Sequence, residues 1–429
     1  MTAPASYNAS ASETRYANYV LVILTMMYTF NYLDRWVLSI LVEDIKADFG
    51  VSDTYMGFLL GPVFAIFYTV LGLPIARLAD RSSRRNILSI AFVAWSAMTA
   101  LSGLARNGID LALARVGVGV GEAGGTAPAH SLLADYFPPE RRAFAFGVFQ
   151  QGVFLGQFFG LTLGAWISTT FSWQQTFIAF GVAGLFGAAL LFATVREPIR
   201  GRYDPAPPES ANTRPSIKEV FALLWGKKSF RALAIGGGIA SFGGTGFGTW
   251  MPALLERALE MPRIEIGTRY GMTMAIFGGL GALLGGYLTD RLSRRDVRWL
   301  LWMPAASVIL SLPLLMAQVF APSANFAVAM AIPSGLLGGG WAPAAYAGVQ
   351  RLAPAHMRAV AASIMVLFIT LLGQGAGPQA IGILSDLFEA EHGLNSIRIA
   401  IAVVLSSYSL AFVALVIGAR HLRNELDSG

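Results

Sequence analysis

The chain reads Ala76-Arg-Leu-Ala-Asp80-Arg81-Ser-Ser-Arg84-Arg85 at the end of one hydrophobic stretch, and Gly286-Tyr-Leu-Thr-Asp290-Arg291-Leu-Ser-Arg294-Arg295 at the same point of its second half. Two further pairs of segments follow in the same order: Gly124-Gly-Thr-Ala-Pro128-Ala129 with Gly339-Gly-Trp-Ala-Pro343-Ala344, and Pro138-Pro-Glu-Arg-Arg142-Ala143 with Pro354-Ala-His-Met-Arg358-Ala359. A repeat of this length in a hydrophobic chain predicts two homologous helical bundles related by an axis along the membrane normal. That architecture is typical of transporters whose two halves rock against each other.

The composition is that of a membrane protein. Of the 429 residues, 55% are hydrophobic and 13% are charged, whereas a soluble domain carries about 25% charged residues. The net charge of +6 would suggest a nucleic-acid partner in a soluble protein. Here the basic residues are spread over short loops, so they indicate membrane topology and we expect no nucleic acid.

Catalytic and metal-binding side chains are sparse. The chain has no cysteine, and its four histidines are far apart in the sequence. Because metal sites need several such ligands at short spacings, we expect neither a metal nor a cofactor. No pairing of a nucleophile with a base is apparent, which argues against an enzyme. Nothing in the sequence demands an oligomer, so we expect a monomer.

Hydrophobic segments of about twenty residues mark the membrane helices. Twelve are predicted, at 17–42, 55–78, 86–105, 109–134, 143–168, 174–195, 231–255, 267–289, 298–318, 324–349, 359–386 and 396–419. They predict an all-α membrane protein with two six-helix bundles. The predicted divisions are a disordered tail (1–15), the N-terminal bundle (16–195), a linker (196–230), the C-terminal bundle (231–420) and a second tail (421–429). Within the linker, Ser216 to Trp225 has helical periodicity and is expected to lie on the membrane surface.

The distribution of basic residues predicts the orientation. Loops on the side of the N-terminus carry 23 of the 31 lysines and arginines, the opposite loops carry 6, and two lie inside spans. The positive-inside rule then places both tails and the linker in the cytoplasm.

The repeated acidic residues Asp80 and Asp290 end the second and eighth spans, and each is followed by three arginines. Such an aspartate can accept hydrogen bonds from a neighbouring helix N-terminus or pair with an arginine of the next loop, such as Arg142 or Arg358. We therefore predict a cytoplasmic gate that closes in one state and breaks in the other. Its members are Asp80, Arg81, Arg84, Arg85, Arg142, Asp290, Arg291, Arg294, Arg295 and Arg358. The alternative is that these residues only set the topology.

Four ionisable residues stand out well inside the predicted spans rather than at their ends, all in the N-terminal bundle: Asp34, Arg35, Arg115 and Glu122. Each costs about 2.5–3.5 kcal/mol in a membrane, which makes all four candidates for function. Arg115 and Glu122 are seven residues apart and share one helix face. The depths of the spans allow Arg115 to contact Asp34, or to exchange this partner for Glu122. Arg35 must point away from its neighbour Asp34. The alternative is a permanent salt-bridge network that fixes helix packing.

The charges of this cluster suggest a mechanism. With both acids ionised the four charges sum to zero, and one proton on Glu122 or Asp34 leaves an arginine without a partner. A buried unpaired charge costs about 3–5 kcal/mol, so a proton and an anion should bind together. This predicts proton-coupled symport of an anion, or uniport of an amphiphile that replaces the ion pair. His130 lies eight residues beyond Glu122 and is a candidate proton relay, although an interior histidine with satisfied hydrogen bonds is the simpler interpretation.

The loop pattern, twelve spans and central linker resemble the major facilitator superfamily. The family's loop motif is Gly-x-x-x-Asp-Arg/Lys-x-Gly-x-Arg/Lys-Arg/Lys. This sequence departs from it, because Ala76 replaces the first glycine and the spacing after Asp-Arg is one residue short in both copies.

Two segments sharpen the resemblance: Asn31-Tyr-Leu-Asp34-Arg35 and Gly119-Val-Gly-Glu122-Ala-Gly-Gly-Thr-Ala-Pro128. They are similar to the spinster branch of the superfamily, in its bacterial form. That resemblance implies a transporter of lysophospholipids or sphingoid phosphates in the bacterial inner membrane. It also implies proton coupling at Asp34 and Glu122 and headgroup binding at Arg115 and Arg35.

Other transporters remain open. A symporter of small organic anions shares the first-span segment but usually has a more polar cavity with charges in both bundles. A drug–proton antiporter normally has a Gly-Pro pair in its fifth span, and here Gly152, Gly156, Gly160 and Gly164 repeat without a proline. That repeat predicts a face of small residues for helix packing. A receptor that does not transport would not need buried charges of both signs.

Overall fold

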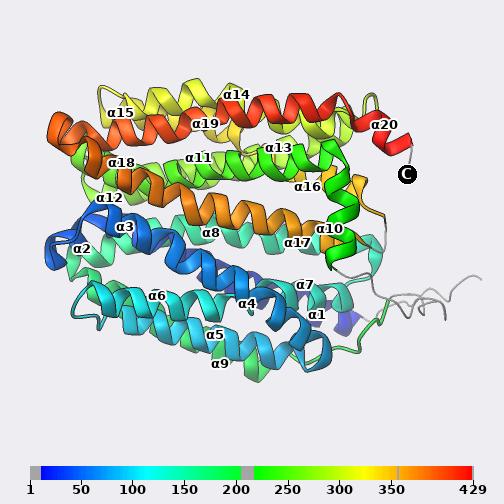
Figure 1. Cartoon of the computed structure of the whole chain (residues 1–429). Helices are drawn as coiled ribbons and strands as arrows, with labels where there is room; N and C mark the ends of the chain where they lie inside the picture. The colour runs from blue at the N-terminus through cyan, green and yellow to red at the C-terminus, as the bar shows by residue number, and fades with distance from the viewer. Residues whose placement is uncertain (1–10, 204–216, 355–356, 428–429) are drawn as a thin grey trace, which may run out of the picture.

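A computed structural model of the chain describes residues 11–203, 217–354 and 357–427. All regular structure in these residues is helical, and the helices form two bundles lying one above the other in Figure 1. The first bundle contains α1 (Ala11–Ile40), α2 (Val42–Phe49), α3 (Asp53–Leu60), α4 (Pro62–Arg81), α5 (Arg84–Ser102), α6 (Gly108–Glu122), α7 (Thr126–Tyr136), α8 (Pro139–Thr170) and α9 (Trp173–Thr194).

The second bundle follows after α10 (Ile217–Gly226), which lies across the long helices at the right of Figure 1. It contains α11 (Lys228–Leu259), α12 (Arg263–Glu265), the π-helix η1 (Ile266–Gly271), α13 (Met272–Ser293), α14 (Trp299–Val319), α15 (Ala324–Gly338), α16 (Trp341–Leu352), α17 (Arg358–Phe368), the π-helix η3 (Ile369–Ala376), α18 (Gly377–His392), the 3₁₀ turn η4 (Gly393–Asn395), α19 (Ser396–Ala419) and α20 (Leu422–Asp427). The predicted all-α, two-bundle fold is confirmed, and the described helices are consistent with the twelve predicted spans, with ends that differ by up to six residues. By length and composition alone, seven stretches of the described helices are apolar enough to cross a membrane.

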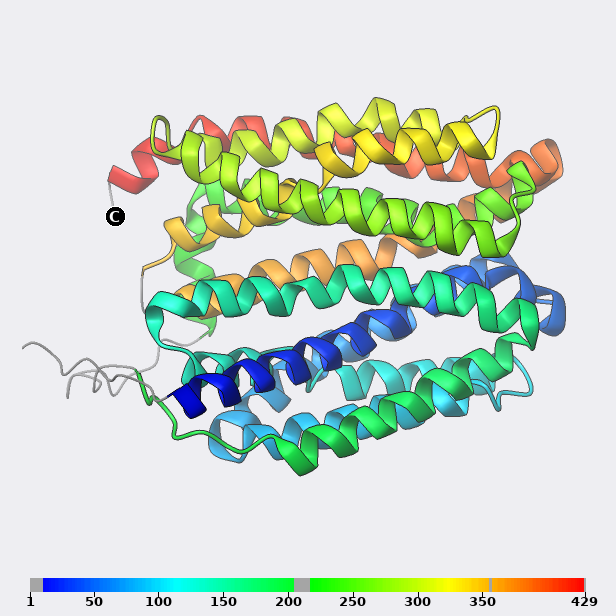
Figure 2. The ribbon, with the colours of Figure 1, turned by 180° about the vertical axis from the view of Figure 1, so that it is seen from behind.

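Two ends of the molecule matter for function. The terminus end is where α1 begins and α20 ends, on the right of Figure 1, and the far end carries α2, α3 and α12. Figure 2 shows the same arrangement from behind. The predicted tail is corrected at one point: residues 11–15 form the first turn of α1, where Glu13 makes an ion pair with Arg202 at 2.7 Å. Residues 1–10 and part of the predicted linker lie outside the described residues.

The glycine-rich repeat breaks one helix in each bundle. The span predicted at 109–134 is divided into α6 and α7 at Gly124 and Gly125, and the span at 324–349 is divided into α15 and α16 at Gly339 and Gly340. A Cβ on Gly339 would lie 2.5 Å from the carbonyl oxygen of Gly278, so only glycine allows this approach. The two breaks at equivalent places support the internal repeat.

The glycines of α8 form the packing face that their spacing predicts. A Cβ on Gly156 would lie 2.6 Å from the carbonyl oxygen of Thr29, and Gly152 and Gly160 make similar approaches to α1. Because the side chains are absent, the backbones of α1 and α8 come close together. α1 is thereby fixed, and with it the charged residues in its second half.

Buried apolar side chains show where the bundles join. One cluster crosses both bundles near the far end and includes Val37, Met56, Trp250 and Ile381. Two other clusters each stay within one bundle: one includes Leu24, Phe92 and Phe149, and the other includes Leu233, Leu301 and Val349. The shared core therefore lies at the far end, and the bundles have separate cores toward the terminus end.

Candidate functional site

A buried ion pair joins α1 to α6. The Arg35 guanidinium lies 2.8 Å from Oε2 of Glu122, and its Nε donates to the same oxygen at 2.9 Å. Glu122 is fully buried and the Arg35 side chain is 14% exposed. The sequence predicted only that Arg35 points away from Asp34, and the structure makes it the partner of Glu122.

Aromatic rings surround the Arg35 guanidinium. Its central carbon lies 4.6 Å from the ring centre of Phe64, 4.7 Å from Tyr32 and 5.1 Å from Tyr68. A cation over aromatic faces is stabilised by about 0.5–2 kcal/mol, more when water is excluded. Asn31, one turn earlier on α1, accepts a further hydrogen bond from Arg35 at 3.1 Å. The guanidinium is thus held by a polar and aromatic cage.

One contact of Arg35 crosses to the second bundle. Its Nη1 donates to Oε1 of Gln374 at 3.2 Å, and Gln374 lies in the π-helix η3. Short π-helical segments often occur at functional sites. Gln374 was absent from the predicted site because neutral side chains inside a span carry little signal. The site therefore lies on the interface between the bundles.

Asp34 and Arg115 are both buried, but their side chains form no ion pair. Arg115 Nη1 donates to the backbone carbonyl of Asp34 at 3.3 Å, and the carboxylate of Asp34 accepts from the Thr99 hydroxyl at 2.7 Å. Asp34 and Arg115 therefore lie close together as predicted, but their side chains do not form the expected ion pair. The Nε of Arg115 and Oε1 of Glu122 have no hydrogen-bond partner within the described chain. Unpartnered buried polar atoms are rare in folded proteins, so a proton, water or ligand is the expected partner of these two atoms.

His130 does not join this network. Its ring makes edge contacts with Phe146 and Phe149, with centroid distances of 5.3 and 5.2 Å. Among the described residues it has no hydrogen bond to Glu122 or Asp34. The aromatic residues of α8 occupy the space beside the ring. The structure therefore gives no relay path through His130.

At the terminus end, Arg84 is the centre of the first loop motif. It is buried and forms ion pairs with Asp135 on α7 and with Glu197 after α9, the second at 2.8 Å. Burial acts to raise the pKa of Glu197, but donors from Arg85 and Arg84 outweigh it and hold that pKa below its usual value. Asp135 and Glu197 were missed, although each is an acid near a helix end and within three residues of a proline, which is a detectable signal.

The other predicted gate residues make local contacts. Arg142 donates to the carbonyls of Ala134 and Phe137, and Arg85 contacts Phe192. In the second half, Arg291 contacts Tyr287, and Asp290, Arg294, Arg295 and Arg358 are exposed. The expected pairing of Asp290 with Arg358 is not formed in the described chain, and the side chain of Asp80 lies outside what is described. The contacts shown by these residues stay within their own bundle, so among the described residues they do not link the two bundles at this end.

Ion pairs between the bundles occur at the far end. Arg257 of α11 binds Asp53 of α3 with nitrogen–oxygen distances of 2.5 and 2.7 Å, and it binds Glu43 of α2 at 2.6 Å. Arg263 binds Asp44 of α2. We call these five residues the far-end latch. They escaped prediction because charges outside the spans were counted only for orientation.

A carboxylate of the second bundle also caps a helix of the first. The two oxygens of Asp386 accept from the backbone N–H groups of Asp53 and Thr54 at 3.0 and 2.7 Å. These groups begin α3, where the helix dipole favours a negative charge. Beside them, a Cβ on Gly382 would lie 2.3 Å from the carbonyl oxygen of Asp53. The far end is thus closed by direct contact of backbone and side chains.

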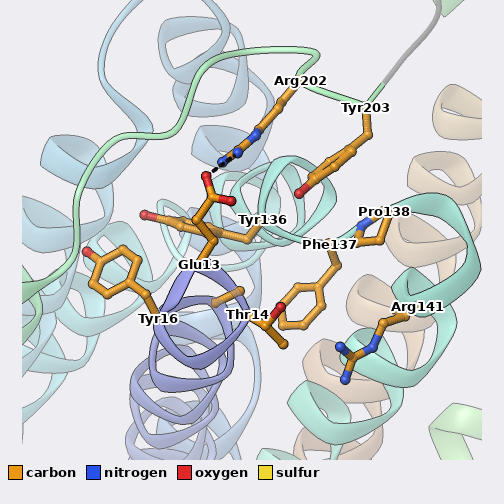
Figure 3. Close-up of a pocket in the computed structure, with 10 residues that line it drawn as sticks. Glu13, Thr14, Tyr16, Tyr136, Phe137, Pro138, Arg141, Arg202 and Tyr203 are labelled. Carbon is orange, nitrogen blue, oxygen red and sulfur yellow. Dashed lines mark hydrogen bonds and ion pairs between the residues drawn. The ribbon is translucent and has the colours of Figure 1, made fainter. Parts of the chain in front are cut away.

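A pocket of about 180 Å³ lies at the terminus end of the first bundle. Figure 3 shows the Glu13–Arg202 pair on one side and Phe137, Tyr203 and Arg141 on the other. This pocket is remote from Glu122, since its residues come from the first turn of α1, the α7–α8 loop and the start of the linker.

Two repeated six-helix bundles, closed at one end around buried charges at their interface, define a secondary transporter. The profile of the Major Facilitator Superfamily matches residues 24–378, and the chain belongs to that superfamily. An "MFS-type efflux pump" of Mycolicibacterium smegmatis is 31% identical over 94% of this chain and 93% of the pump. A hexuronate transporter of Bacillus subtilis is 28% identical over 65% of this chain and 66% of its own.

Relatives of the spinster type also match. A sphingosine-1-phosphate transporter of Danio rerio is 27% identical over 87% of this chain and 77% of its own. The crystal structure of a bacterial homologue of the human lysosomal transporter spinster, in an inward-facing and unoccupied conformation, is 28% identical. It covers 97% of this chain and 99% of its own, with a TM-score of 0.88. The resemblance seen in the sequence is therefore confirmed.

Proposed function

We propose that this protein moves an anionic amphiphile of the lysophospholipid or sphingoid-phosphate type across the membrane by alternating access, coupled to protons. The observation that carries the proposal is the buried Arg35–Glu122 pair, which also reaches Gln374 of the second bundle. A site that binds both bundles can sense substrate and bias their relative position, as alternating access requires.

Proton coupling follows from the charge balance of this pair. Protonation of Glu122 removes the negative charge beside Arg35, which is then buried without a counter-ion. An unpaired buried charge costs about 3–5 kcal/mol, and an anionic headgroup would supply the missing charge. Arg35 presents several donors in a fixed plane, which suits two oxygens of a phosphate group. A proton and an anion therefore enter together, and Asp34 offers a second carboxylate for the same role.

The surroundings of Arg35 favour an amphiphile. Its cage is built from Phe64, Tyr32 and Tyr68, and aromatic walls accept an apolar chain next to a bound headgroup. The relatives of spinster type support the same substrate class. The efflux pump among the relatives is compatible with outward movement of such a molecule.

A symporter of small organic anions is the second candidate, and the hexuronate transporter favours it. Such a substrate needs polar partners around its whole surface. Here the second bundle contributes the neutral Gln374 to the cluster, and the nearest neighbours of Arg35 in the first bundle are largely aromatic. This arrangement gives the amphiphile the better fit.

The orientation and location belong to the same proposal. The terminus end carries most of the basic loop residues and would face the cytoplasm of a bacterial inner membrane. With the far end closed and the terminus end toward the cytoplasm, the structure corresponds to an inward-facing state. Because one chain contributes every residue of the Arg35 cluster, we expect it to act as a monomer.

The test is ligand stabilisation of the purified protein. The melting temperature would be compared with a lysophospholipid, a sphingoid phosphate and a hexuronate at pH 5.5 and 7.5. Selective stabilisation by the single-chain phosphates, dependent on pH and lost in Arg35→Ala but kept in Arg269→Ala, would support the proposal. Arg269 is an exposed control that pairs with Glu265. A response to hexuronate alone would move the protein to the organic-anion symporters.

A further inference from the structure

The two halves of the chain carry opposite charges at one equivalent position. Asp135 stands three residues before Pro138, and Arg351 stands three residues before Pro354. Both prolines follow the second part of the broken helices, α7 and α16, at the terminus end. The repeat thus places a carboxylate in the first half where the second half has a guanidinium.

In the first half the chain neutralises its own buried arginine. Arg84 pairs with Asp135 and Glu197, and it also donates to Ser131 at 2.9 Å. The pocket in this part of the molecule contains the matched pair of Glu13 and Arg202. The carboxylates needed at this end are therefore supplied by the protein itself.

In the second half, three arginines line a pocket of about 400 Å³. Arg351 comes from α16, Arg358 begins α17 and Arg423 lies on α20, and Val297 and Leu426 complete the lining. Arg351 and Arg358 are seven residues apart on consecutive helices, and the tertiary fold brings Arg423 of α20 to them.

The charges of this pocket are not balanced. Within the described chain, Arg351 and Arg358 have no hydrogen-bond or ion-pair partner. Arg423 pairs with Asp296 at 2.9 Å, but Asp296 also binds Arg298 at 2.7 Å. Like charges repel one another, and an exposed arginine normally reduces this repulsion by turning into solvent. Arg351, Arg358 and Arg423 are exposed, yet all three line the same cavity.

We propose that this arginine pocket binds a phosphate group, either the headgroup of an anionic phospholipid or free phosphate. Guanidinium groups form paired hydrogen bonds with phosphate oxygens, and a phosphate has enough oxygens to contact several of them. The bound anion supplies the negative charge that Asp135 and Glu197 supply in the first half. Val297 and Leu426 give the pocket an apolar wall beside the three arginines.

The pocket connects to the substrate site through one continuous helical stretch. α17 begins at Arg358 and continues directly into η3, which holds Gln374. An anion that ties Arg358 to Arg351 and Arg423 restrains the start of this stretch. Occupation of the pocket therefore stabilises the second bundle at the end where it has no shared core with the first.

The experiment uses the full-length purified protein with three probes: phosphatidylglycerol, phosphatidylcholine and inorganic phosphate. The melting temperature and the lipid retained in native mass spectrometry are measured for the wild type and for Arg351→Ala/Arg358→Ala. We expect phosphatidylglycerol, but not phosphatidylcholine, to raise the wild-type melting temperature, and the double variant to lose at least half of that shift. An equal shift from inorganic phosphate identifies free phosphate as the ligand.

The matched control is Arg294→Ala/Arg295→Ala, which removes two exposed arginines from the same end of the same bundle. It keeps the full shift if the pocket is a defined site. Equal losses in both double variants would mean that only net charge matters, and an unchanged shift in Arg351→Ala/Arg358→Ala would exclude the pocket. Arg35→Ala keeps the phosphatidylglycerol shift, so this outcome is independent of the proposed substrate site.

Discussion

Arg257 and Asp53 connect the two bundles, with two guanidinium nitrogens of Arg257 2.5 and 2.7 Å from the two carboxylate oxygens of Asp53. Asp53 is buried, and the Arg257 side chain is 10% exposed. A pair of this geometry is worth more than a surface salt bridge because water screens it poorly. Since the bundles must separate here for the far end to open, this contact must break in each transport cycle.

The Arg257→Ala variant should open the far end. It leaves Lys46 of the same bundle as the cation paired with the buried Asp53, so the closed state loses its link between the bundles at a cost below that of a fully unpaired buried charge, about 3–5 kcal/mol. The chain has no cysteine, so spin labels can be attached at Phe171→Cys and Leu394→Cys, which are exposed far-end positions in different bundles. We expect a longer distance population that is rare in the parent protein. The same population in Arg269→Ala, or its absence from Arg257→Ala, would contradict the latch.

Glu122→Gln should remove the pH dependence of uptake. The amide is similar in shape to the carboxylic acid, so the protein keeps its packing, but the residue can no longer exchange a proton. Uptake into proteoliposomes would be measured between pH 5.5 and 7.5, with Glu389→Gln as an exposed control. A pH profile unchanged from the wild type would move coupling to Asp34, and Asp34→Asn would then be the informative variant.

Arg35→Lys should weaken substrate binding although it keeps the positive charge. Lysine cannot contact Glu122, Gln374 and Asn31 together, because it lacks the planar set of donors. Loss of one charge-assisted hydrogen bond costs about 1.5–3 kcal/mol, which corresponds to roughly a tenfold or larger rise in Kd. Isothermal titration with the stabilising phosphate lipid measures this change. Wild-type affinity in Arg35→Lys would show that the substrate does not use the guanidinium.

Glu197→Gln should reduce stability only above acidic pH. The pKa of Glu197 is held below its usual value in the folded protein. The stabilisation is therefore present above the ordinary carboxyl pKa and is lost as pH falls through the lowered one. After allowance for solvent screening the effect is about 1 kcal/mol or less. Melting curves of the wild type and the variant should differ at pH 7 and converge in acid. A difference that persists in acid would refute the charge-based explanation.

The fold was predictable because the sequence patterns that determine it extend over many residues. Twelve hydrophobic spans, a repeated loop motif and a repeated glycine segment each predict the same two-bundle arrangement, and the structure agrees with all three. The break between α6 and α7 was not predicted, since hydropathy alone does not show where a glycine pair interrupts a helix.

The charge cluster was predictable in its members but not in its pairing. Sequence gives the depth of Asp34, Arg35, Arg115 and Glu122 in the membrane. Neighbouring residues on a helix differ in direction by about 100°, so the rotation of α1 decides whether Asp34 or Arg35 meets Glu122. That rotation is set by the packing of α1 on the glycines of α8, which is a tertiary property. The contact between Arg35 and Gln374 depends on how the two bundles are placed relative to each other, which the sequence does not give.

The cap that Asp386 places on α3 turns two backbone amides into reporters of the transport cycle. While the far end is closed, the N–H groups of Asp53 and Thr54 are bound by a carboxylate that belongs to the other bundle. When the bundles separate, both amides meet water, and a helix of eight residues such as α3 has little intrinsic stability once its first turn is released. Deuterium uptake at these two amides would then count openings directly, without a label on the protein or knowledge of its substrate.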